Sequence, residues 1–308
     1  MVLVQIGNFK LNPPIGIKKG VLQGDPLSSV LFNLFLADFE EVMKQTQAPK
    51  ISLKYSQKEL NYLQFADDVA LIADNRLYLQ KLLTHMQNYA NLNLLKINER
   101  KTKIMIFRRG GNINIVKEVF FINNKRLEVV RTYKYLGVKF YASGRFHDTA
   151  KEMVTKAKQK SDAMWQLLLK VNLSKFSNYM YYFDTAILST IMYAAQIWAL
   201  DEEEIMELAQ THFIRKLLLI FPPRSANYFI RLETGRIHTQ HRLMTLAIKF
   251  HGKILKMHDT RLPKIMYEEQ SHQDTTSPAY GENRGWLKTY EKTLNRYGSS
   301  VEEIRRLY

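Results

Sequence analysis

Residues Leu63 to Ala73 read LQFADDVALIA, and this stretch decides the fold. Two short apolar segments with the residue types of β-strands meet at an acidic pair, Asp67 and Asp68. Adjacent carboxylates repel each other, and a tight turn between apolar strands partly removes them from water, so a bound cation would stabilise them. Oxygen ligands of this kind suit Mg²⁺. Taken alone, however, the dipeptide is more typical of a solvated turn.

The segments around this stretch predict a mixed β/α region. Asp25 before Pro26 is typical of a helix start, and two apolar stripes predict that this helix, reaching to about Glu41, is buried on two sides. Asn75 opens a further helix. Strands are predicted at 103–107, 120–122, 126–130 and 135–141, with a hairpin turn at Asn123–Asn124.

Beyond about Thr149 the strand signals fade and long helical patterns follow. Helices are predicted at 150–171, 174–200 and 202–220. The change places a domain boundary near Arg145, so we predict an α+β fold with a mixed domain at 1–145 and a helical region at 146–267. Residues 268–283 have the composition of an exposed linker, and 284–308 that of a C-terminal amphipathic helix.

The charge of the chain indicates a polyanionic partner. Its 308 residues are 46% hydrophobic, enough for folded cores, and carry a formal net charge of +16. Residues 96–145 alone hold 13 basic and 3 acidic side chains. A concentrated basic stretch is typical of a surface that contacts nucleic-acid phosphates, although an excess of charge could also serve solubility alone.

Two absences narrow the classes of protein to which the chain can belong. The chain has no cysteine, which excludes disulfides, thiolate zinc sites and cysteine nucleophiles. No signal peptide is visible at the start, and the most apolar stretch, Thr185–Leu200, is short for a membrane span and better explained as a buried helix. We therefore expect an intracellular protein, nuclear or cytoplasmic rather than secreted, without a membrane partner.

Four motifs follow one another along the chain. They are GVLQGDPLSSVLFNLFLADFE at 20–40, LQFADDVALIA at 63–73, LNLLKINERKTKIMIF at 92–107 and YKYLGVKF at 133–140. In this order they resemble motifs B, C, D and E of a reverse transcriptase palm. FADD rather than YADD, after QGDPLSS, is similar to non-LTR retrotransposon enzymes. The stretches at 187–200 and 209–235 resemble the thumb and post-thumb region of insect-type elements, so the likeness spans roughly Lys18 to Lys256.

The resemblance implies a fold and an activity. It implies a partial polymerase palm at 1–145, with an antiparallel sheet and helices, followed by an all-helical thumb. The implied activity is RNA-directed DNA polymerisation, in which two Mg²⁺ ions assist transfer of a nucleotide from a dNTP to a primer 3′-hydroxyl. The implied partners are an RNA template and a DNA primer.

The resemblance also assigns roles near the acidic pair. Asp67 matches the firmer metal ligand and Asp68 its partner, while Phe65 and Ala66 would pack beside the primer terminus.

Motif B lies before the first helix. Gln23, Gly24 and Asp25 match its turn, which lies near the template base and the incoming nucleotide. Asp25 could equally be a simple helix cap, and both roles can hold together.

Motifs D and E supply the remaining candidates. Lys101 matches the lysine that approaches the departing pyrophosphate and can protonate it, with Lys103 as the fallback; a contact to a phosphate backbone is an equally good reading. Tyr135, Leu136 and Gly137 match the primer grip, a hairpin that holds the primer backbone.

A third carboxylate, given by motif A in this family, has no counterpart before motif B. None of the 24 residues preceding Asp25 is acidic. We therefore expect an incomplete two-metal site, missing fingers and exposed apolar surface on the 26–41 helix. Three readings follow: a truncated or degenerate polymerase inactive alone, a non-catalytic nucleic-acid-binding remnant, and a maturase-like splicing cofactor, which the FADD form disfavours.

Some other residues look chemically interesting but have ordinary explanations. We expect the following to be surface histidines rather than metal ligands: His238, His241, His251 and His258. Tyr193 and Trp198 are expected in the core rather than in a platform that stacks on bases.

Overall fold

The computed structural model describes residues 5–6, 9–10, 20–22, 25–46, 50–108, 118–171, 175–220, 225–273 and 285–308. Contacts divide the chain into two compact units. The first contains residues 1–52, 59–102 and 118–127, and the second contains residues 53–58, 103–117 and 128–308. The chain therefore passes between the two units several times.

The first unit combines short hairpins with helices. Its helices are α1 (Pro26–Phe35), α2 (Phe39–Lys44) and α3 (Arg76–Leu92). Its antiparallel pairs are β1 (Gln5–Ile6) with β2 (Phe9–Lys10), β3 (Ile51–Ser52) with β4 (Glu59–Leu60), and β5 (Tyr62–Phe65) with β6 (Asp68–Leu71). The predicted start of α3 is confirmed, because the Asn75 side chain accepts the N–H of Tyr78 at 3.0 Å.

One small core lies under these elements. Phe39, Met43 and Leu82 are fully buried, and Phe39 meets the ring of Tyr62 edge-on at 5.2 Å. The hydroxyl of buried Tyr89 donates to Asp38 at 2.7 Å, which satisfies its one polar atom. The α1, α2 and α3 helices thus share a core with the base of the β5–β6 hairpin.

The outer face of α1 differs from the predicted burial on two sides. Leu27, Val30 and Leu34 are 60%, 61% and 70% exposed. The prediction of two-sided burial is wrong in the described chain, whereas the expected exposed apolar surface on this helix is present.

The strands that follow belong partly to each unit. β9 (Lys125–Val130) pairs antiparallel with β8 (Phe120–Ile122) through residues 125–127 in the first unit. Its residues 128–130 pair in parallel with β7 (Lys103–Met105) in the second unit. The predicted hairpin turn is confirmed, since Asn123 and Asn124 both have positive φ, 47° and 59°.

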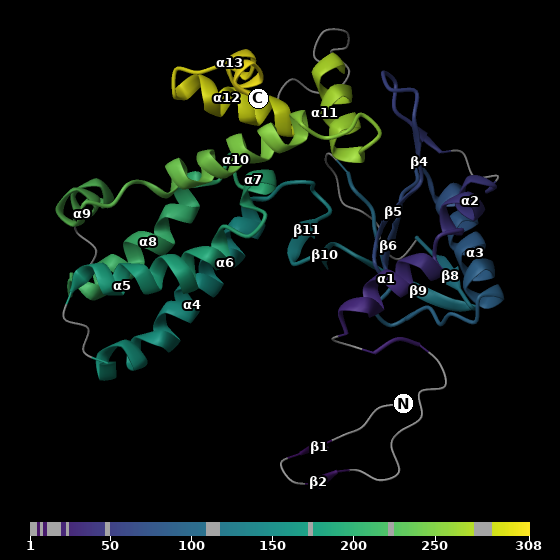
Figure 1. The fold of residues 1–308 in the computed structure, drawn as a ribbon, viewed down its shortest axis with the longest axis horizontal. Coiled ribbons are helices and arrows are strands. Elements are labelled where there is room, and N and C mark those ends of the chain that lie inside the picture. The colour runs from purple at the N-terminus through teal and green to yellow at the C-terminus, as the bar shows by residue number, and fades with distance from the viewer. Residues whose placement is uncertain are drawn as a thin grey trace. The chain divides into compact units, whose positions relative to one another are not determined.

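The second unit is mostly helical. It contains the hairpin of β10 (Thr132–Tyr135) and β11 (Val138–Tyr141). Its longer helices are α4 (His147–Val171), α5 (Phe176–Tyr182), α8 (Glu203–Leu217), α9 (Asn227–Thr234), α10 (Thr239–Leu255), α11 (Leu262–Gln273) and α12 (Trp286–Arg296), and α13 (Val301–Leu307) is the last. α4 packs along α8, and α10 packs on α8, α11 and α13 (Figure 1).

The segment predicted as one helix at 174–200 is broken. After α5 come a π-helical turn, η2 (Phe183–Leu188), and two short helices, α6 (Ser189–Ile191) and α7 (Ala195–Trp198). Ala194 lies in the left-handed region with φ 52°, and it separates α6 from α7. The apolar pattern thus continues, but the helix does not.

The C-terminal region also differs in detail. Residues 268–273, which composition placed in a linker, form the last part of α11. The C-terminal helix predicted at 284–308 consists of α12 and α13, and the latter begins with a capping box of Ser300 and Glu303.

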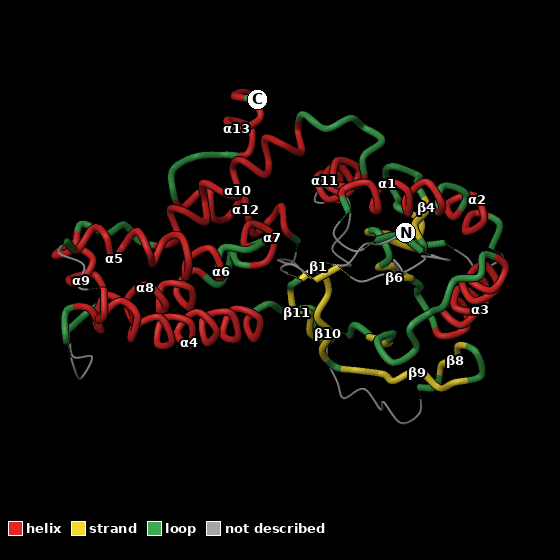
Figure 2. Tube along the Cα trace, turned by 60° about the horizontal axis from the view of Figure 1, so that its bottom comes forward, coloured by secondary structure: helices red, strands yellow, loops and turns green. Residues whose placement is uncertain are grey.

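The predicted α+β class is confirmed. Figure 2 shows strands confined to the first half of the chain and helices thereafter. The single antiparallel sheet implied by the palm resemblance is instead divided into small sheets, with one parallel pair. Across the described ranges, no helix has both the length and the apolar character that crossing a membrane requires.

Candidate polymerase site

The acidic pair lies at the end of the β5–β6 hairpin. Phe65 is paired with Asp68 across the two strands, so only Ala66 and Asp67 form the turn. Ala66 has a φ of 50°, an unusual value for a residue with a Cβ atom. Asp67 therefore occupies the tip, and Asp68 is the first residue of the returning strand.

Both carboxylates are exposed. The partial desolvation that the neighbouring apolar strands suggested does not occur, because the base of the hairpin is packed while its tip reaches solvent. The Phe65 ring beside them is 61% exposed. Two carboxylates and an aromatic ring thus share an accessible tip.

The oxygen chemistry of this tip fits a hard divalent cation in part. Asp67 and Asp68 could contribute carboxylate oxygens to Mg²⁺, an ion that keeps several waters and takes other ligands from substrate phosphates. Among the described residues no group of three or more acidic or histidine side chains is assembled that could hold a metal ion. The pair alone therefore fits a site that other ligands must complete.

The motif B candidates are only partly visible. Gln23 and Gly24 lie outside the described residues. The Asp25 carboxylate accepts the N–H of Leu27 at 2.9 Å and caps α1, so the helix-cap role is confirmed. A second role for Asp25 near a nucleotide stays a prediction.

The motif D lysines have different surroundings. Lys101 is exposed in the turn before β7, where its N–H donates to the backbone and side chain of Asn98. The Nζ of Lys103 lies 2.6 Å from an Oε2 of Glu128. Lys103 thus has a carboxylate partner, and the roles of both lysines at the pyrophosphate stay predictions.

The primer-grip candidates form a second two-residue turn. Tyr135 pairs with Val138 across β10 and β11, which leaves Leu136 and Gly137 as the turn. Both have positive φ, 46° and 86°, as a type I′ hairpin turn requires. Thr149 on α4 donates its hydroxyl to the carbonyl of Lys139 at 2.6 Å and so fixes the hairpin on that helix.

Tyr193 is a residue that the sequence interpretation assigned to the core. Its ring is instead 52% exposed and lies against the Leu136–Gly137 turn, and its hydroxyl donates to the Leu136 carbonyl at 3.0 Å. Trp198 is buried at 3% exposure, as predicted. The exposed tyrosine could not be found from periodicity, because it lies in the break between α6 and α7, at residues 192–194.

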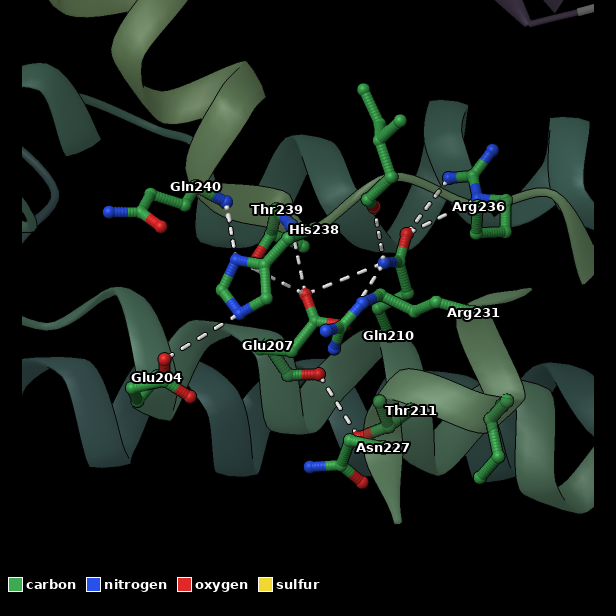
Figure 3. Close-up of polar contacts among 12 residues, drawn as sticks. Glu204, Glu207, Gln210, Thr211, Asn227, Arg231, Arg236, His238, Thr239 and Gln240 are labelled. Atoms are coloured by element: carbon green, nitrogen blue, oxygen red, sulfur yellow. Dashed lines mark hydrogen bonds and ion pairs between the residues drawn. The ribbon is translucent and has the colours of Figure 1, made fainter. Parts of the chain in front are cut away.

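A polar network in the helical region was also missed (Figure 3). The buried Glu207 carboxylate accepts the backbone N–H of Thr239 at 2.9 Å and pairs with Arg231 at 3.2 Å. His238 accepts the N–H of Gln240 at 3.1 Å and so caps α10. The His238 side chain is only 14% exposed. It therefore lies largely buried beside this network, and the prediction of a surface histidine is wrong here.

Asp184 extends the same region. Its carboxylate accepts from Arg236 at 2.6 Å and from Arg242 at 2.8 Å. Burial raises the pKa of this carboxyl, but the hydrogen bonds and charges of the two arginines outweigh burial and lower it overall. Asp184 therefore stays ionised and ties the π-helical turn to the start of α10.

His251 is the clearest departure among the histidines. It is fully buried, with its ring nitrogens 3.3 Å from the hydroxyl of Tyr290 and 3.0 Å from that of Tyr267. Burial, with the charges of Arg305 and Lys264, lowers the pKa of His251 to about 4. The prediction of a surface histidine is wrong here, and the neutral ring belongs to the packing of the C-terminal helices.

Comparison with known proteins gives a family for the first part of the chain. Residues 2–140 match the family "Reverse transcriptase (RNA-dependent DNA polymerase)". No solved structure matches the chain.

Two curated relatives carry the same kind of name. A Retrovirus-related Pol polyprotein from type-1 retrotransposable element R2 of Popillia japonica is 31% identical over 146 residues, which cover 46% of this chain and 20% of the relative. A Retrovirus-related Pol polyprotein from type-2 retrotransposable element R2DM of Drosophila melanogaster is 30% identical over 133 residues, 41% of this chain and 12% of the relative. The matched part thus spans a fifth or less of these relatives.

Proposed function

We propose, from the premise that residues 2–140 are a reverse transcriptase domain homologous to part of the R2 Pol polyproteins, a role in RNA-directed DNA synthesis. The chain would supply the later palm and the thumb of a non-LTR retrotransposon polymerase. The observation that carries this proposal is that Asp67 lies in a two-residue hairpin turn, Asp68 follows it directly, and both are exposed.

The residues of the chain would have separate roles in metal binding and primer binding. Asp67 and Asp68 would hold the divalent cations, and Phe65 would pack beside the primer terminus. Mg²⁺ bound there would neutralise phosphate charge and favour attack by the primer 3′-hydroxyl. Leu136 and Gly137 would hold the primer backbone.

The contribution of this chain to the metal site is two carboxylates from one hairpin. A two-metal mechanism clamps both the attacking and the leaving oxygens, which needs a further carboxylate to hold the two ions in place. None of the 24 residues before Asp25 is acidic. We therefore propose that the chain on its own does not extend a primer.

A second candidate function is nucleic-acid binding without catalysis. Exposed basic side chains favour it, and within residues 96–145 they include Lys96, Arg100, Arg108, Arg131, Lys134 and Arg145. Either function would place the protein with nucleic acid in the nucleus or cytoplasm. The maturase-like reading gains no support from the described residues.

Primer extension separates these candidates. The chain would be compared with a fusion protein in which a reverse transcriptase segment containing motif A and the fingers precedes it, on an RNA template with a DNA primer, Mg²⁺ and dNTPs. We expect extension by the fusion protein and none by the chain alone. If the fusion protein binds the primed template but never extends the primer, the result would contradict the polymerase function and favour nucleic-acid binding without catalysis.

A further inference from the structure

The Leu136–Gly137 turn is in direct contact with a tyrosine from a distant part of the sequence. The hydroxyl of Tyr193 donates to the carbonyl of Leu136 at 3.0 Å. A Cβ atom at Gly137 would lie 2.7 Å from Cε1 of the Tyr193 ring. The ring thus occupies the space above the glycine while its hydroxyl satisfies the neighbouring carbonyl.

The backbone of Tyr193 is held by a further hydrogen bond. The indole N–H of buried Trp198 donates to the carbonyl of Tyr193 at 3.0 Å. Ala194, the next residue, is in the left-handed region with φ 52°. A non-glycine residue persists there only when its surroundings fix it, so the helix break that presents Tyr193 is itself held by packing.

The hairpin is therefore fixed at two levels. At its returning strand, Lys139 is bonded to α4 through its carbonyl and through an ion pair with Glu152 at 2.7 Å. At its tip, the contact with Tyr193 sets the position of the two turn residues. The tip itself remains exposed and accessible to a ligand.

We propose that Tyr193 is a positioning residue, which holds the Leu136–Gly137 turn where it meets the 3′ end of a DNA primer. This inference rests on the proposed function. A primer 3′ end reacts only when it lies in one position relative to the incoming nucleotide, and misplacement by about 1 Å can lower the reaction rate a hundredfold. A turn fixed by both a ring and a hydrogen bond meets that requirement better than a free hairpin.

A purely structural tyrosine would behave differently. Replacing such a tyrosine would change the stability of the protein and weaken the binding of all nucleic acids alike. A positioning residue for the primer end acts on substrates that have such an end, so the selectivity between two substrates separates the two roles.

The test uses the full chain and two labelled RNA–DNA hybrids of equal length, one with a recessed DNA 3′ end and one blunt. Fluorescence anisotropy gives both Kd values for the parent protein, Tyr193→Phe and Tyr181→Phe. The matched control, Tyr181, is an exposed tyrosine on α5. Losing one hydrogen bond should weaken binding of the recessed hybrid by about threefold to tenfold with Tyr193→Phe, while the blunt hybrid and the control change little.

A second variant approaches the same contact from the hairpin. Gly137→Ala places a Cβ against the Tyr193 ring and should give the same selective loss, which keeps the test decisive if Tyr193→Phe folds poorly. Equal loss on both hybrids, or no loss, would overturn the inference. A parent protein that binds both hybrids equally would also overturn it but leave nucleic-acid binding intact, whereas binding to neither would overturn the proposed function as well.

Discussion

Phe65 and Asp68 face each other as the last cross-strand pair of the β5–β6 hairpin. Their pairing allows only Ala66 and Asp67 in the turn and determines where both carboxylates lie. The cost of this tight turn is the positive φ of Ala66. The geometry of the acidic pair thus depends on a residue that carries no charge.

Ala66→Val should destabilise the first unit. A β-branched side chain is strongly disfavoured at positive φ, and we expect a loss of about 1–3 kcal/mol in the free energy of unfolding. Urea denaturation measures it. Ala70→Val, in strand β6 of the same hairpin, is the matched control and should cost less, because valine favours strands. Equal effects at the two positions would argue against strain at Ala66.

Asp184→Asn should destabilise the helical region. The change leaves Arg236 and Arg242 without their carboxylate partner, and breaking a half-buried pair of this kind should cost about 2 kcal/mol near neutral pH. The lowered pKa of Asp184 stabilises the fold above the usual carboxyl range, and this contribution is lost as the pH falls through that range. Asp184→Asn should therefore flatten the acid limb of a plot of melting temperature against pH.

His251 should give a separate pH dependence. Its pKa in the folded protein is about 4, so the unfolded chain binds a proton more readily below its ordinary pKa of about 6.5. Stability should be complete above that pH and fall by up to about 3 kcal/mol as the pH drops toward 4. His251→Gln should remove this dependence, whereas His258→Gln, at an exposed site, should retain it.

The exposed basic side chains should set the salt dependence of nucleic-acid binding. If Arg131 and Lys134 contact phosphates, replacing either with alanine should reduce the log–log slope of affinity against salt by about 0.9 on a duplex. Lys44→Ala is the control, since Lys44 is paired with Glu40 at 2.7 Å. If the affinity of the parent protein does not change with salt concentration, the net charge serves solubility rather than phosphate binding.

Local signals in the sequence predicted much of the first unit. Two short apolar segments with an acidic pair between them predicted the strands and turn of the β5–β6 hairpin, and Asn75 predicted the start of α3. Asn123–Asn124 predicted the β8–β9 turn in the same way. Each of these depends on residues that are close in the chain, which is why pattern alone was sufficient.

The structure differs from the sequence-based predictions where contacts between residues distant in the chain determine the local conformation or burial. The helix break at residues 192–194 is held by the contacts of Tyr193 with Trp198 and with the Leu136–Gly137 turn, and no helical pattern predicts these contacts. His251 is buried because tyrosines from α11 and α12 close over it. In the polar end of α11, the buried Glu269 carboxylate accepts the N–H groups of Tyr55 and Ser56. Composition indicated a linker there because this partner lies more than 200 residues away.

The most direct test of the account is the dependence of polymerisation on the hairpin tip. In the fusion protein with motif A and the fingers, primer extension rates would be measured across a Mg²⁺ titration for Asp67→Asn, Asp68→Asn and the control Asp74→Asn, an exposed aspartate beyond β6. We predict that Asp67→Asn slows extension by at least about a thousandfold, a loss of roughly 4 kcal/mol in transition-state stabilisation, while Asp74→Asn stays near the parent rate. Extension by Asp67→Asn at close to the parent rate would contradict the assignment of the acidic pair as the metal-binding carboxylates.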